Sequence, residues 1–148
     1  MENDLSAHDA LAAVETDRRR LGERMTAETP WAAPAQGLVA ALLVGAPAAG
    51  FPGVFFVTSA SIALAVAVEW MFRKRSGLSI SAPAGRRGMA LLVLLIVLLC
   101  GLTVLSYVLL IFDLTPWIAP LAVFGGVLTA LGVVAYDRVY ASDVRRVR

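Results

Sequence analysis

Residues 31–68 read WAAPAQGLVAALLVGAPAAGFPGVFFVTSASIALAVAV and contain no charged side chain. A helix needs roughly 20 mostly apolar residues to cross a membrane, so this run is long enough for two crossings. Gly50, Pro52 and Gly53 lie near its middle, and glycine and proline are typical of turns. The run therefore predicts a hairpin of two membrane-spanning helices, at about 33–49 and 54–72.

Two further uncharged runs, residues 88–112 and 114–136, follow later in the chain. Each has the length of one crossing, so they predict a second hairpin with helices at about 89–112 and 116–136. Asp113, between the two runs, is interpreted as a turn residue. The chain is 59% hydrophobic and 16% charged, whereas about 25% of a typical soluble domain is charged. We expect an all-α integral membrane protein with four transmembrane helices arranged as two hairpins.

The positions of the basic residues predict an orientation. All 13 Lys and Arg residues lie before Trp31, between Arg73 and Arg87, or after Asp137. Four crossings would bring these three segments to one face of the membrane and leave the opposite face without a cation. Because cytoplasmic segments are enriched in Lys and Arg, we expect both the N-terminus and the C-terminus in the cytoplasm.

These boundaries divide the chain into three predicted parts. Residues 1–30 form a cytoplasmic N-terminal helix that precedes the membrane. Residues 31–136 form the four-helix transmembrane domain, which includes a basic cytoplasmic loop at 73–87. Residues 137–148 form a basic cytoplasmic tail.

The N-terminal part is predicted to be an amphipathic helix from Ser6 to about Ala27. Four apolar residues form one narrow stripe, namely Leu11, Val14, Leu21 and Met25, and together with Arg18 they follow one another at three- and four-residue steps. Thr29 and Pro30 are expected to end the helix, because the residue before a proline avoids helical backbone angles. Such a small segment cannot bury a core of its own. Its stripe therefore requires the bilayer, a partner helix or a second copy of the chain.

The charge of this segment suggests one further contact. The residues before Trp31 include four cations and seven acids, a net charge of −3, whereas residues 73–87 carry five cations and no acid. Docking of the N-terminal helix on the basic loop is therefore one hypothesis.

Two of the predicted helices carry small residues at every fourth position. Small residues at this spacing allow helix backbones to approach closely in a membrane. The first face consists of Gly37, Ala41, Gly45 and Ala49, and the second of Ala122, Gly126 and Ala130. The two faces either pack against each other within one chain or pack against another copy in a homo-oligomer.

Glu69 lies beside the first uncharged run and is a candidate for ion or proton handling. An ionisable residue inside a membrane helix is expensive and is therefore a functional candidate. Arg73 follows one helical turn later, so a structural ion pair near the cytoplasmic end of the helix is the alternative. Both interpretations remain open at this point.

The basic loop predicts contact with lipid. Cations close to the surface of an anionic leaflet each contribute about 1 kcal/mol of attraction. The candidate residues for contact with anionic lipids or a protein partner are Arg73, Lys74, Arg75, Arg86 and Arg87. Binding of nucleic acid is not expected, because these cations flank membrane segments and do not form a folded basic domain.

No residue pattern predicts catalysis, a metal or a cofactor. Cys100 is the only cysteine and His8 the only histidine, which excludes a disulfide framework and the usual zinc spacings. The sequence contains no phosphate-binding loop, dinucleotide-binding glycine motif or recognisable nucleophile–base pair. We therefore expect a non-enzymatic protein with an accessory, scaffolding or regulatory role at its cytoplasmic face.

A small transporter or channel is the alternative function, with Glu69 as its working residue. Four short membrane helices are similar to those of small multidrug transporters. That family, however, relies on a glutamate in the first membrane helix and often has a weak charge bias. Here the acid lies in the second predicted helix, and all 13 Lys and Arg residues lie on one predicted face of the membrane.

Several segments resemble those of small four-span membrane proteins of high-GC actinobacteria. These segments are Ala10–Glu15 running into Arg18-Arg19-Arg20, Pro30-Trp31, Arg73–Leu78 and Gly85-Arg86-Arg87. The resemblance extends over nearly the whole chain and implies a location in a bacterial plasma membrane. It implies no catalytic activity.

Overall fold

The computed structural model describes the backbone of residues 2–77 and 86–146. Its elements are all helical: α1 (Glu2–Gly45), η1 (Ala46–Ala49), α2 (Gly50–Ser76), α3 (Arg86–Ile111), η2 (Thr115–Trp117) and α4 (Ile118–Arg146). The described ranges contain no strand, so the predicted all-α class is confirmed.

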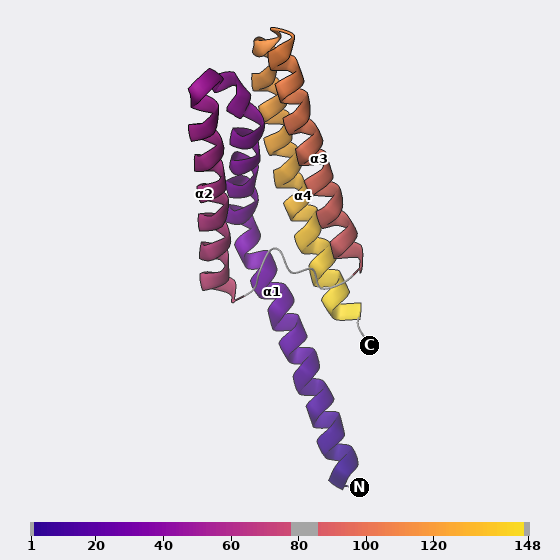
Figure 1. Ribbon diagram of the computed structural model, residues 1–148. Helices are drawn as coiled ribbons and strands as arrows, with labels where there is room; N and C mark the ends of the chain where they lie inside the picture. Colours follow the sequence, from indigo (N-terminus) through magenta and orange to yellow (C-terminus); the bar gives the residue numbers. More distant parts are fainter. Residues whose placement is uncertain (1, 78–85, 147–148) are drawn as a thin grey trace.

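Three helical stretches are long and apolar enough to cross a membrane, namely Ala27–Ser76, Arg86–Ile111 and Thr115–Tyr140. The first contains 50 residues and reverses its direction at η1, so that α2 returns alongside α1 (Figure 1). These lengths and compositions are those of a helical membrane protein.

The reversal between α1 and α2 depends on glycine and proline. Pro47 lies in the first turn of the short helix η1, and the N–H of Gly50 donates to the carbonyl oxygen of Pro47. Gly50 has a φ of 62°, a left-handed conformation that glycine adopts without steric cost. Phe51 is then non-helical, with φ −88° and ψ 132°. The bend therefore lies where Gly50, Pro52 and Gly53 predicted a turn.

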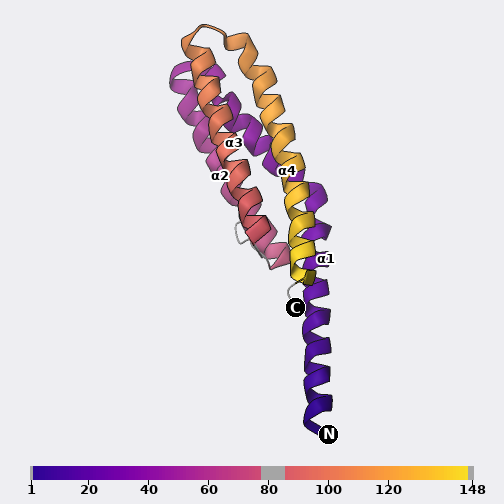
Figure 2. The ribbon, with the colours of Figure 1, turned by 90° about the vertical axis from the view of Figure 1, so that its right-hand side faces the viewer.

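The helices form two hairpins joined through α1 and α4. These two helices are antiparallel and make the most extensive contact, whereas α2 packs on α1 and α3 packs on α4 (Figures 1 and 2). On the α3 side, Leu95 occupies the space that a side chain at Gly132 would fill. A Cβ at Gly125 would lie 3.3 Å from Leu102. Two leucines one heptad apart therefore fit against two glycines of α4.

Most of the buried apolar residues in the described chain are alanine or valine, whereas many large apolar residues are exposed. The buried apolar residues include Ala32, Ala33, Ala40, Val44 and Ala122. Exposed residues include Phe56 on α2 and Leu94, Val97 and Ile111 on α3. Lipid tails are as apolar as leucine, so burial of large apolar side chains does not drive helices together in a bilayer. Helices associate there through close packing of small residues. The distribution is the one expected of helices surrounded by lipid.

The predicted end of the N-terminal helix at Thr29 and Pro30 is wrong. Helix α1 continues through Pro30 and Pro34 to Gly45, and its N-terminal part leads away from the other helices (Figures 1 and 2). A proline inside a helix removes one backbone hydrogen bond, but packing against a neighbouring helix can compensate for this loss. In this chain α4 runs along α1 beside Pro30, where Thr29 of α1 donates to Asp137 of α4.

The other helix boundaries also differ from the predictions, by up to ten residues. Helix α2 runs to Ser76, and its end is marked by Gly77, whose φ is 71° and whose N–H donates to the carbonyl of Arg73. Helix α4 continues beyond Tyr136 to Arg146. The centre of the predicted basic loop, residues 78–85, lies outside the described residues, as does its proposed docking with the N-terminal helix.

Candidate functional site

The two faces of small residues meet inside one chain. A Cβ placed on Gly37 would lie 2.7 Å from the carbonyl oxygen of Gly126 and 3.0 Å from the Cβ of Ala130. A Cβ on Gly126 would lie 2.8 Å from the carbonyl oxygen of Gly37 and 2.9 Å from the Cβ of Ala41. No real side chain tolerates such distances from backbone atoms, so both glycines are required for this approach of α1 and α4.

The last two residues of the first face, Gly45 and Ala49, contact different helices. A Cβ on Gly45 would lie 3.3 Å from the Cβ of Ala122, so this pair continues the contact between α1 and α4. Ala49 lies instead at the bend, 3.0 Å from the position of a Cβ on Gly53 in α2. Ala49 therefore contributes to the bend between α1 and α2.

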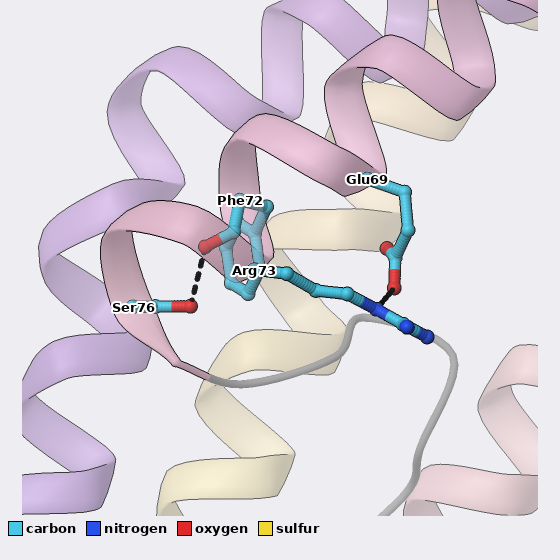
Figure 3. Close-up of polar contacts among 4 residues, drawn as sticks. All are labelled: Glu69, Phe72, Arg73 and Ser76. Atoms are coloured by element: carbon cyan, nitrogen blue, oxygen red, sulfur yellow. Dashed lines mark hydrogen bonds and ion pairs between the residues drawn. The ribbon is translucent and has the colours of Figure 1, made fainter.

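The candidate acid Glu69 lies near the C-terminal end of α2 and is paired with Arg73. The Nε of Arg73 donates to Oε1 of Glu69 at 2.9 Å, and both side chains are partly exposed (Figure 3). In the next turn the hydroxyl of Ser76 donates to the carbonyl of Phe72 at 2.7 Å (Figure 3). The geometry is that of an ion pair within one helix, the structural alternative for Glu69.

The neighbouring cations Lys74 and Arg75 lie over aromatic rings. The Nζ of Lys74 is 5.0 Å from the centroid of the Trp70 ring, and the Cζ of Arg75 is 5.3 Å from that of Trp31. Cations at such distances are attracted to the ring face. The Nη1 of Arg75 is also 3.9 Å from Oε2 of Glu28, which accepts a hydrogen bond from the indole N–H of Trp31.

The remaining candidate cations, Arg86 and Arg87, begin α3 and are exposed. Neither forms a hydrogen bond or ion pair with another residue in the described part of the chain. They lie at the same end of the bundle as the last turn of α2 (Figure 1). We call this end, where α2 and α4 end, α3 begins and α1 leads away, the basic end.

An aromatic cluster lies beneath the cations at the basic end. Phe72 and Tyr136 are buried there with Ala32 between the helices. The Trp31 and Phe72 rings are 6.5 Å apart, and those of Tyr136 and Tyr140 are 6.4 Å apart. Tryptophan and tyrosine are enriched where membrane helices meet water. The cluster therefore marks the level at which the apolar bundle ends.

Asp137 is a buried acid that the sequence analysis did not single out. Its exposed fraction is 3%, and its Oδ2 accepts a hydrogen bond from the hydroxyl of Thr29 across α1 and α4. The spacing of Asp137 in the sequence could have indicated its burial. Asp137 lies at helical spacing behind Ala130 and Val133, on the face of α4 that the small residues define.

The part of the chain that the structure describes contains no arrangement that suggests a metal site. Within the described residues, no group of three or more His, Cys, Asp or Glu side chains could hold an ion. Cys100 is exposed on α3.

No protein-family model matches the chain, and no curated protein or solved structure matches it either. The resemblance to small four-span actinobacterial proteins therefore stays a prediction.

Proposed function

We propose that this chain is a non-enzymatic bacterial plasma-membrane protein with an accessory, scaffolding or regulatory role at its cytoplasmic face. In this proposal the bilayer is crossed four times, by about residues 33–49 at the end of α1 and in η1, and by α2, α3 and α4. The clustering of helix ends with basic residues at one end of the bundle supports an orientation with both termini in the cytoplasm (Figure 1).

The observation that carries the proposal is the continuity of α1. One helix joins the small-residue contact at Gly37 to a segment that extends beyond the basic end (Figure 2). Residues 2–17 of this segment include five acids and no Lys or Arg. A charged helix that leads away from the bundle suits contact with a cytoplasmic or membrane-bound protein, or with a second copy. Binding there would act directly on a helix of the membrane domain.

The orientation can be tested by cysteine labelling in a Cys100→Ser background. Ala13 lies in the N-terminal segment and Thr115 in the turn at the opposite end, and both are exposed. We expect a membrane-impermeant maleimide to label Thr115→Cys on intact spheroplasts, and Ala13→Cys only after permeabilisation. The reverse pattern would place the basic end outside the cell and refute the orientation.

The role of the N-terminal segment can be tested by affinity purification from native membranes. The full chain is compared with a chain that lacks residues 2–26, after melting curves show that both retain the folded bundle. We expect a protein partner that is enriched with the full chain and lost from the shortened one. Identical sets of co-purified proteins would remove the segment from the proposed function.

A further inference from the structure

The last turn of α2 carries three consecutive cations whose side chains are held in different ways. Arg73 is ion-paired with a carboxylate of its own helix, whereas Lys74 and Arg75 lie over the rings of Trp70 and Trp31. From this difference we propose that Lys74 and Arg75 bind the phosphate groups of anionic phospholipids in the adjacent leaflet. Arg73 contributes little to this binding.

Lys74 retains its capacity to donate hydrogen bonds. Its ammonium forms no hydrogen bond or ion pair with another residue of the described chain. The ring of Trp70 attracts the charge through its face, but it does not replace the three N–H donors of the ammonium group. An anion on the side opposite the ring therefore completes the environment of this cation.

Arg75 is also only partly satisfied within the chain. Its nearest carboxylate oxygen, on Glu28, lies 3.9 Å away, and its side chain is 55% exposed. This distance is too long for a hydrogen bond, and the carboxylate already accepts the indole N–H of Trp31. A guanidinium group can donate two parallel hydrogen bonds to a phosphate, whereas the carboxylate of Glu28, at 3.9 Å, accepts none from Arg75.

The surroundings favour lipid over a soluble anion. The ring of Trp70 is 60% exposed and follows the exposed residues Ile62 and Val66 along α2. Tryptophan rings prefer the depth of lipid headgroups, so a cation resting on such a ring lies at the depth of the phosphates. The inference rests on the proposed function only in taking the basic end to lie at the membrane surface.

The test measures the relative association of spin-labelled phosphatidylglycerol and phosphatidylcholine with the full-length protein in phosphatidylcholine vesicles. We expect the wild-type protein to prefer phosphatidylglycerol. Since each cation near an anionic surface contributes about 1 kcal/mol, Lys74→Gln and Arg75→Gln should each weaken this preference by up to about fivefold. Removing the supporting ring, with Trp70→Leu, should weaken it as Lys74→Gln does.

Two matched controls make the test specific. Arg73→Gln alone would leave Glu69 unpaired, so it is combined with Glu69→Gln, which removes the ion pair without changing the net charge, and we expect a change below twofold. Trp117→Leu removes an exposed tryptophan from the opposite end of the bundle and should have no effect. An equal loss in the double variant would overturn the proposal, and so would an unchanged preference in Trp70→Leu, which would indicate a general charge effect. A wild-type protein without lipid preference would also overturn it.

A separate arm distinguishes lipid from a soluble anion. Excess inorganic phosphate, at constant ionic strength, should leave the preference unchanged; if it abolishes the preference, the proposal is overturned in favour of a soluble anion. Both leaflets of the vesicles have the same composition, so the result does not depend on the orientation of the protein. A negative result in the lipid test therefore does not refute the proposed orientation. The cysteine-labelling experiment tests that orientation separately.

Discussion

At the scale of single residues, Gly37 and Gly126 determine how closely α1 and α4 approach. Each would place a Cβ less than 3.0 Å from the carbonyl oxygen of the other. Backbone atoms cannot move aside as the end of a flexible side chain can. The contact therefore requires glycine at both positions and not merely small residues.

The first prediction concerns Gly126→Ala. We expect a loss of about 1–3 kcal/mol in stability, the usual cost of inserting a methyl group into a packed contact. Gly101→Ala is the matched control, since nothing lies within 4 Å of a Cβ at Gly101 on α3, and alanine favours a helix by up to about 1 kcal/mol. Unfolding in detergent micelles measures both. Equal melting temperatures for the two variants would contradict the assigned contact.

A second residue-scale prediction concerns the buried Asp137. Thr29→Val keeps the shape of the side chain but removes the hydroxyl that donates to the carboxylate. A buried polar group that loses its partner costs about 1–3 kcal/mol, so we expect a lower melting temperature, with Thr29→Ser close to wild type. Asp137→Asn combined with Thr29→Val should cost less than the sum of the single changes. If the loss of stability in the double variant equals the sum of the losses in the two single variants, the two groups do not interact.

At the scale of elements, α1 differs most from its prediction. Pro30 was expected to end a helix because proline disfavours helical geometry at the preceding residue and lacks an N–H donor. Both effects are local. The contact of α1 with α4, which includes Thr29 and Asp137, acts on the same residues from another part of the chain and favours the continuous helix.

The continuity of α1 predicts the distance between two spin labels placed on either side of its prolines. Spin labels at Arg20→Cys and Gln36→Cys, in a Cys100→Ser background, lie on either side of Pro30 and Pro34. Sixteen residues of uninterrupted helix span about 24 Å, and double electron–electron resonance should give one narrow distribution near that value. A pair with the same separation on α3, Leu94→Cys and Leu110→Cys, provides the control. A distribution much broader than that of α3 would contradict a continuous α1.

At the scale of the whole molecule, the arrangement of hairpins places α1 and α4 in the centre and leaves large apolar faces of α2 and α3 exposed. The small residues are used between α1 and α4 of one chain. A second copy therefore has to bind elsewhere than on these faces.

A disulfide can distinguish contact within one chain from contact between copies. The Cβ position of Gly45 is 3.3 Å from the Cβ of Ala122, close to the Cβ–Cβ separation of about 3.5–4.5 Å in disulfides. Mild oxidation of Gly45→Cys with Ala122→Cys, in a Cys100→Ser background, should give a cross-linked monomer. Denaturing gel electrophoresis without reductant would reveal a covalent dimer if the faces paired between copies.

Much of the fold could be predicted from local composition. The uncharged runs predicted apolar helices, and Gly50, Pro52 and Gly53 predicted the position of the reversal, because both depend on a few consecutive residues. The spacing of Gly37 and Gly126 with their alanine neighbours predicted two packing faces. Asp137 escaped notice because its charge suggested the solvated tail, although its spacing matched the buried face of α4.

The sequence by itself determined which segments are apolar enough for a membrane and where cations gather, because the partition of a segment between lipid and water depends on its own side chains. Only the tertiary structure decided that the two small-residue faces meet, that α1 passes Pro30 without a break, and that Arg75 lies over the ring of Trp31. Small residues permit close approach to any surface, and a cation accepts any nearby partner. The partners of the small-residue faces and of Arg75 lie in distant parts of the chain, so the local sequence does not determine them.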